Sequence, residues 1–271
     1  MNERIALVTG ASGEGIGRHS ARALRAAGFR VFAGARRPEA MDELRAEGFE
    51  PVRLDMTDAD SLEEAVRTVG RVDVLVNNAA YALLGPVEEL NMDAFRREME
   101  TNVFGLIRLT QLVLPGMRER GGGRIVNVGS MGGELTIPVG GAYHASKYAL
   151  EALSDALRVE TRGFGVRVSL IQPGAVRTAF GDVADGFLKP QAEGPYRRMI
   201  EAYARIVQET YRENLRGAIP PEKVARAILH AATAARPKTR YRVGLQANVL
   251  IRLRHLVPDP LWDAAMRKLM A

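Results

Sequence analysis

Short apolar runs alternate with longer helical patterns over about the first 175 residues, and this alternation constrains the fold more than any other feature. The apolar runs predict strands at Ile5–Thr9, Val31–Ala35, Pro51–Leu54, Val72–Val76, Arg124–Val128 and Val166–Ile171. The helical patterns cover Ile16–Ala27, Glu39–Ala46, a stretch ending at Val69, Asp93 to about Leu114, and Ala142–Thr161. Such alternation predicts an α/β fold, a doubly wound parallel sheet with helices on both faces. Ligands of such sheets bind beyond the carboxyl ends of the strands.

The rhythm breaks after Pro173. A loop-like stretch is expected at Gly181–Pro195, followed by helices at Tyr196–Leu215 and Pro221–Ala234 and a short strand at Tyr241–Val243. We therefore predict a single domain over residues 1–271: a core at 1–178, a small helical lid over the substrate at 179–220, and a basic tail at 236–271. Asp58 and Ser61 are both candidate N-caps for the helix that ends at Val69.

The net charge of +6 lies in the tail. Residues 236–271 hold eight Lys and Arg against two Asp, which leaves 30 basic and 30 acidic residues in the rest of the chain. A neutral body argues against nucleic acid as a partner. The absence of cysteine excludes disulfides, iron–sulfur clusters and a cysteine nucleophile, and four scattered histidines give no metal-ligand spacing. Without a targeting segment or a long apolar stretch, we expect a soluble, cytoplasmic protein.

The tail has an apolar segment with basic flanks, Asn248–Val257, which carries Arg252, Arg254 and His255. Such a segment can contact an anionic membrane surface. We favour the alternative that the tail packs over the substrate cleft or a partner subunit with its arginines solvated. Binding to anionic liposomes is then expected to be weak.

A glycine-rich turn follows the first strand and opens the first helix. Its glycines allow the backbone to approach a pyrophosphate, and the helix N-terminus attracts the negative charge. The residues expected at phosphate are Gly10, Ser12, Gly15, Ile16 and Gly17. The spacing is neither Gly-x-Gly-x-x-Gly nor a complete P-loop, so a nucleotide triphosphatase is not expected.

The second strand ends in Arg36 and Arg37, about where an acidic residue would bind the adenosine ribose of NAD. Two guanidiniums there favour the 2′-phosphate of NADP over the alternative, a solvated basic pair that opens a helix. Glu14, inside the turn, argues the other way, because its carboxylate repels a phosphate unless it points to solvent.

Tyr143 and Lys147 lie four residues apart on a predicted helix and so share one face. A lysine ammonium one turn away should lower the pKa of the phenol, so that Tyr143 can exchange a proton near pH 7. Ser130 follows the fifth strand and can bind a substrate carbonyl.

From Arg4 to Thr178 the chain resembles the short-chain dehydrogenase/reductase family. The landmarks stand in family order: the turn Thr9–Gly17, Asp55, Asn77–Asn78–Ala79, Asn102, Ser130, Tyr143-x-x-x-Lys147 and Pro173–Thr178. The resemblance implies a Rossmann-like fold and hydride transfer between a nicotinamide and an alcohol or ketone carbon.

The resemblance also implies residue roles. Tyr143 is the expected general acid/base, Ser130 polarises the carbonyl, Lys147 binds the nicotinamide ribose, and Asn102 holds a water that links Lys147 to a proton relay. Further cofactor contacts are expected at Asp55, Met56, Asn78, Val176 and Thr178. The expected cofactor is NADP(H), with NAD(H) possible, and a homo-dimer or homo-tetramer is expected.

Two departures from the family pattern concern the cofactor. Gly10 and Gly15 enclose four residues where the family has three, which lengthens the loop over the pyrophosphate, and Ala80 stands where the family favours glycine. The altered turn keeps open an alternative function, a catalytically silent dinucleotide-binding sensor or scaffold.

Four stretches most resemble the hydroxysteroid- and retinol-dehydrogenase-like branch: Val31–Pro38, Tyr81–Leu90, Asn102–Gly116 and Gly141–Leu157. This resemblance implies a bulky apolar ketone or secondary alcohol as substrate. The candidate pocket walls are Leu83, Leu84, Met131, Leu135, Ile137, Phe180 and Phe187.

Overall fold

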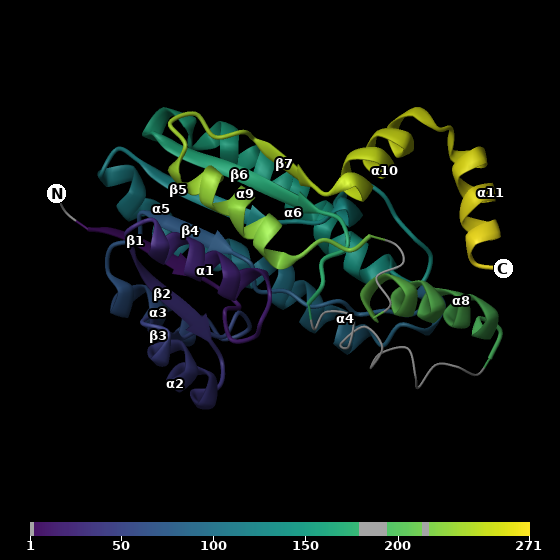
Figure 1. Ribbon diagram of the computed structural model, residues 1–271, viewed down its shortest axis with the longest axis horizontal. Helices are drawn as coiled ribbons and strands as arrows, with labels where there is room; N and C mark the ends of the chain where they lie inside the picture. Colours follow the sequence, from purple (N-terminus) through teal and green to yellow (C-terminus); the bar gives the residue numbers. More distant parts are fainter. Residues whose placement is uncertain (1–2, 179–193, 213–216) are drawn as a thin grey trace.

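The computed structural model describes residues 3–178, 194–212 and 217–271, and its centre is a parallel sheet of seven strands (Figure 1). The strands are β1 (Arg4–Val8), β2 (Phe29–Ala35), β3 (Glu50–Arg53), β4 (Val74–Asn77), β5 (Gly123–Val128), β6 (Val166–Pro173) and β7 (Arg240–Val243). They lie in the order β3-β2-β1-β4-β5-β6-β7. The order reverses between β1 and β4, so a crevice forms beyond the carboxyl ends of these two strands.

Two apolar clusters cover the two faces of the sheet. The first joins the sheet to α1 (Ile16–Ala26), α2 (Pro38–Ala46) and α9 (Pro221–Thr233). The second joins it to α3 (Ala59–Val69), α5 (Gly105–Glu119) and α6 (Gly141–Glu160). Fully buried leucines such as Leu24 and Leu109 each stabilise their helix by about 1.5–3 kcal/mol. The doubly wound sheet predicted from the alternation is therefore confirmed.

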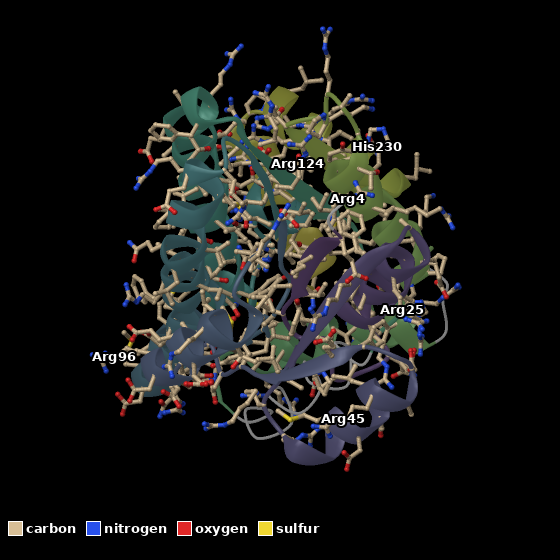
Figure 2. All side chains as sticks on the ribbon, turned by 90° about the vertical axis from the view of Figure 1, so that its left-hand side faces the viewer. Arg4, Arg25, Arg45, Arg96, Arg124 and His230 are labelled. Atoms are coloured by element: carbon tan, nitrogen blue, oxygen red, sulfur yellow. The ribbon has the colours of Figure 1, made fainter. Side chains whose placement is uncertain are left out.

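The strands begin at the end of the sheet that faces the reader in Figure 2, where Arg4 and Arg124 lie. Here β4 starts two residues later than the expected Val72. Asp73 stands just before it and accepts hydrogen bonds from the backbone N–H of Ile5 (2.9 Å) and from Arg71 Nε (2.8 Å). At the start of α3, Asp58 rather than Ser61 is the cap, because its carboxylate accepts from the Ser61 N–H at 3.1 Å.

The long helix expected from Asp93 is interrupted. α4 (Met92–Met99) passes through a π-helical turn, Glu100–Phe104, into α5, which continues to Glu119. Gly105, the first residue of α5, lies so close to the Met56 carbonyl that an added Cβ would be 2.0 Å from its oxygen. The helix therefore needs glycine where it passes the loop after β3.

Beyond β6, α8 (Arg197–Val207) runs into a second π-helical turn, Gln208–Arg212. Together, α8 and this turn cover most of the helix expected at Tyr196–Leu215. Phe180 and Phe187, two of the expected pocket walls, lie outside the described residues. No helix in the described part of the chain combines the length and hydropathy needed to span a membrane.

The tail forms α10 (Leu245–Leu256) and α11 (Asp259–Leu269). The sequence led us to expect that the arginines of the tail are solvated, but two of them form ion pairs. The Nη2 of Arg240 lies 2.6 Å from Asp155 Oδ2, and its Nε lies 3.1 Å from Glu151 Oε2. The Nη2 of Arg254 lies 2.6 Å from Asp259 Oδ1, within the tail itself. The tail is thus bound to the neutral body partly by the body's own acids.

Candidate active site

The glycine turn closes on the segment after β4, at the point where the strand order reverses. The Asn78 side chain donates to the carbonyl oxygens of Thr9 (3.0 Å) and Gly10 (3.1 Å). The Thr9 hydroxyl accepts from the N–H groups of Asn78 and Ala79, both at 2.9 Å. Gly10 has φ +67°, and a Cβ there would be 2.9 Å from Ala79 Cα, so only glycine fits.

The N-terminus of α1 faces the same crevice. Gly15 precedes the helix without a side-chain cap, and the first turn holds no acidic residue. An added Cβ on Gly17 would be 2.4 Å from the Gly10 oxygen. Uncapped N–H groups beside a turn that admits no side chains form a suitable cradle for the pyrophosphate of a dinucleotide.

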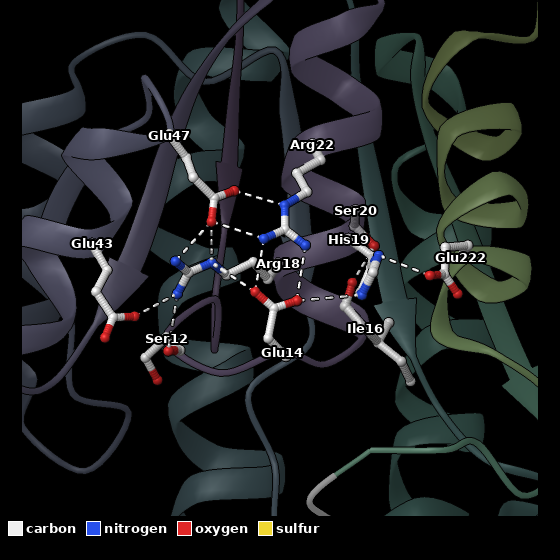
Figure 3. A network of polar contacts seen from close by, with 10 residues as sticks. All are labelled: Ser12, Glu14, Ile16, Arg18, His19, Ser20, Arg22, Glu43, Glu47 and Glu222. Atoms are coloured by element: carbon white, nitrogen blue, oxygen red, sulfur yellow. Dashed lines mark hydrogen bonds and ion pairs between the residues drawn. The ribbon is translucent and has the colours of Figure 1, made fainter.

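Glu14 lines the same pocket, but its charge is not isolated, because it belongs to an ion-pair network that joins the turn to α1 (Figure 3). Its carboxylate accepts from both terminal nitrogens of Arg22, at 2.8 and 2.7 Å. Arg18, 5 % exposed, donates to Glu47, to Glu43 and to the Ser12 carbonyl of the turn. The residues that lengthen the turn are therefore anchored to α1 and α2, and the arginines compensate the charge of Glu14.

The network predicts how stability depends on pH. Hydrogen bonds from Arg22 lower the pKa of Glu47 to about 2, against an ordinary value of 4.5. Because the folded-state pKa is depressed, the stabilisation is complete above pH 4.5 and is lost as the pH falls toward 2. We expect Glu47→Gln to lower the melting temperature at pH 6 and to differ much less from wild type at pH 2.5. A difference that is equally large at both pH values would contradict this assignment.

Ser130, Tyr143 and Lys147 meet beyond the carboxyl end of β5. Ser130 follows β5 and its hydroxyl accepts from the Gly132 N–H at 3.0 Å and hydrogen-bonds the Tyr143 phenol. Tyr143 and Lys147 lie in α6, and the lysine Nζ is 5.7 Å from the centre of the Tyr143 ring. Lys147 is 3 % exposed and donates to the Val128 carbonyl at 3.0 Å.

The expected effect of Lys147 on Tyr143 is not what the structure gives. Burial raises the pKa of the Tyr143 phenol, and the hydrogen bond from Ser130 opposes this only in part. Burial also lowers the pKa of Lys147 to about 8, which leaves the ammonium form less firmly held. Desolvation therefore decides the direction of both pKa shifts.

Asn102 lies in the π-helical turn and is engaged with the loop after β4. Its amide accepts from the Tyr81 N–H (3.1 Å) and donates to the Tyr81 carbonyl (2.8 Å) and to the Ser146 hydroxyl (3.0 Å). One helical turn earlier, the buried Glu98 accepts from the Leu83 N–H at 2.8 Å. Two side chains of one helix thus fix the extended segment that leads to the pocket.

Glu98 and His144 were not identified from the sequence. Burial raises the pKa of Glu98 to about 7. His144, also buried, lies 2.9 Å through Nδ1 from the Gly132 carbonyl oxygen, so it fixes the loop that carries Ser130. The available signal for Glu98 was its position four residues before Asn102 on the same helix face.

One pocket of about 490 Å³ joins the glycine turn to Ser130, Tyr143 and Lys147. Among the expected site residues, it is lined by Gly10, Gly15, Ile16, Asn78, Ser130, Tyr143, Lys147, Val176 and Thr178. The others, which do not line it, are Ser12, Gly17, Arg36, Arg37, Asp55, Met56 and Asn102. Met56 is 4 % exposed beside α5, and Asp55 accepts from Thr57 in its own loop, whereas Arg36 and Arg37 are exposed at the end of β2.

The far part of the pocket is mostly apolar. Of the expected walls, Leu84, Met131 and Ile137 line it, whereas Leu83 and Leu135 are buried and do not line it. Elements after β6 complete it with Tyr203, Ile206, Val207, Thr210, Tyr211, Gln246, Leu250 and Leu269. Because Leu250 and Leu269 belong to α10 and α11, the tail packs over the cleft, the arrangement favoured from the sequence.

Comparisons with known proteins agree with this geometry. The short chain dehydrogenase family profile matches residues 4–185. The chain is 35 % identical over 282 residues to the uncharacterized oxidoreductase YusZ of Bacillus subtilis, covering 99 % of each protein. It is 37 % identical over 286 residues to the 17-beta-hydroxysteroid dehydrogenase type 1 of Homo sapiens, covering 96 % of this chain and 83 % of that one.

Among solved structures, a short-chain dehydrogenase from Streptomyces avermitilis superposes with a TM-score of 0.78 at 36 % identity, covering 99 % of this chain and 96 % of that one. The fold, the family profile and full-length relatives thus lead to one conclusion. The chain belongs to the short-chain dehydrogenase/reductase family of oxidoreductases.

Proposed function

We propose that the protein transfers hydride between NADP(H) and a bulky, apolar ketone or secondary alcohol of steroid-, retinoid- or aryl-ketone-like shape. The observation that carries this proposal is the mostly apolar lining that Leu84, Ile137 and Leu250 give the pocket, in which Ser130, Tyr143 and Lys147 also lie. Apolar walls favour a substrate with few polar groups. The similarity to a hydroxysteroid dehydrogenase supports the same substrate class.

In this proposal the chain positions the carbonyl and moves the proton. When bound, the nicotinamide supplies or accepts the hydride. The hydroxyls of Ser130 and Tyr143 hydrogen-bond the substrate oxygen, and Tyr143 donates its proton as negative charge develops there. In the oxidative direction Tyr143 accepts the proton of the alcohol. Lys147, held by the Val128 carbonyl, supplies positive charge beside the phenol.

The preference for NADP(H) is proposed from Arg36 and Arg37. Both are exposed at the end of β2, and neither forms an ion pair with any other residue that the structure describes. Arg36 is near enough to Tyr81, a pocket residue, to act on its charge. Exposed guanidiniums at this strand end can bind a 2′-phosphate.

Replacing Arg36 by serine is expected to raise the KM for NADPH by about 10- to 100-fold, the worth of a charge-assisted hydrogen bond, and to change the KM for NADH little. The assay follows cofactor absorbance with a panel of steroid, retinoid and aryl ketones. Arg162→Ser, an exposed arginine after α6, is the control. Equal losses with both cofactors, or faster wild-type rates at low NADH than at low NADPH, would refute the NADP preference.

A further inference from the structure

Glu98 is a fully buried carboxylate with incomplete hydrogen bonding. Its side chain is 0 % exposed, and one oxygen accepts from the Leu83 N–H at 2.8 Å. The other oxygen, Oε2, is buried and has no partner among the residues that the structure describes. Most buried polar atoms in proteins are paired, and an ionised carboxylate without full pairing is strongly destabilising. The position therefore needs a reason beyond fixing the loop after β4.

Lys147, on the neighbouring helix α6, is a buried ammonium without a carboxylate beside it among the described residues. It is 3 % exposed, and its ammonium donates to the Val128 carbonyl but has no carboxylate within 4 Å in the described part of the chain. α4, which carries Glu98, packs against α6, which carries Lys147. Glu98 is the one acid among the described residues whose charge acts on Lys147.

Glu98 also acts on the pocket phenols around it. Its charge raises the pKa of Tyr143, from α6, and of Tyr81, from the loop after β4. Arg36 and Arg97 act on Tyr81 in the opposite direction. The groups that face Glu98 are thus one ammonium and two phenols, all of them pocket residues.

We propose that Glu98 is the counter-charge of Lys147 and a positioning residue for the reaction, a role that rests on the proposed function. An isolated ammonium in this buried place favours its neutral form, which offers Tyr143 no positive charge. With Glu98 ionised on the adjacent helix, Lys147 keeps its proton and Tyr143 remains the protonated donor. The Glu98 carboxylate and the Lys147 ammonium need not be in contact for this effect, because Coulomb interactions in a poorly solvated site act over several ångströms.

Glu98→Gln tests the charge and leaves an oxygen to accept from the Leu83 N–H. Because Glu98 raises the pKa values of both Lys147 and Tyr143, its loss lowers both. The alkaline limb of kcat/KM for ketone reduction is therefore expected to move to lower pH by about one unit. Glu98→Asp, which keeps a carboxylate, should move it less. Glu151→Gln is the matched control, since Glu151 is also buried but hydrogen-bonds Gln172 and Arg240 instead.

A double-mutant cycle supplies a readout without substrate. Urea unfolding at pH 7.5, between the pKa values of about 7 for Glu98 and about 8 for Lys147, compares Glu98→Gln, Lys147→Met and the double variant. Each single variant leaves one buried charge uncompensated, so the double variant should lose less stability than the two single losses added together. Additive losses, or an alkaline limb that Glu98→Gln leaves in place, would overturn the role of Glu98. If no ketone is reduced by the wild type, the proposed function fails, and the cycle still decides on Glu98.

Discussion

Replacing Tyr143 by phenylalanine is expected to lower kcat for ketone reduction by about 10²- to 10⁴-fold, the usual contribution of a general acid. The variant removes one hydroxyl, which hydrogen-bonds Ser130 beside the pocket. Burial raises the pKa of this phenol, so it is protonated at neutral pH and can act as the donor. NADPH affinity, measured by the fluorescence of the bound nucleotide, is expected to change only a few-fold, because the ring remains.

Tyr148→Phe is the control for this substitution. Tyr148 lies on the same helix directly after Lys147, but its side chain is 41 % exposed and does not line the pocket. The same chemical change there should leave kcat within about a factor of two, as surface substitutions usually have small effects. Undiminished turnover by Tyr143→Phe would exclude Tyr143 as the acid and the mechanism with it.

The second large effect is expected from Gly17→Ala. In most helices alanine in place of glycine is stabilising by about 0.5–1 kcal/mol. At Gly17, however, the added Cβ would lie 2.4 Å from the Gly10 oxygen and 2.6 Å from the Asn78 side chain. The backbone has to move, and such overpacking costs about 1–3 kcal/mol, so the clash outweighs the gain in helix propensity.

A displaced cradle is also a poor dinucleotide site. A shift of about 1 Å in a positioning element can reduce activity about 100-fold, and we expect a loss of that order in kcat/KM for NADPH. Gly163→Ala is the control, because no atom lies within 4 Å of the Cβ that it adds. Calorimetric titration with NADPH measures the affinity. Wild-type affinity in Gly17→Ala would show that the turn does not hold the cofactor.

The fold could be predicted largely because its signals are local. Apolar runs of the right length and spacing indicate parallel strands, and the turn Thr9–Gly17 lies where the first strand meets the first helix. Two rules predict that Ser130, Tyr143 and Lys147 lie close together. Strand ends converge at one edge of a parallel sheet, and residues four apart share a helix face.

What the sequence did not reveal depends on contacts between distant segments. Glu98 is one acid among several on a helix that reads as polar, and only the packing of α4 against α6 shows that it is buried. Glu14 was expected to repel a phosphate, because the sequence does not show that Arg22 pairs with it or that Glu47, just after α2, accepts from Arg22. Leu83 and Leu135 were expected as pocket walls, since periodicity does not separate a core leucine from a pocket leucine.

The same reason explains the error about Tyr143. Spacing shows that a lysine lies one turn away, but the desolvation of a side chain depends on everything that covers it. In this pocket Tyr203, Tyr211 and the segment after β4 surround the phenol, so burial decides the direction of its pKa shift.

The most direct test of the account is the transfer of the hydride itself. NADPH deuterated at the transferable C4 position is incubated with the protein and the most reactive ketone of the panel, and the alcohol is analysed by mass spectrometry. We predict one deuterium on the carbinol carbon of the product from the wild type, and labelled product formed about 10²- to 10⁴-fold more slowly by Tyr143→Phe. NADPH binding without labelled alcohol from any ketone would contradict the account and favour a dinucleotide-binding protein without catalysis.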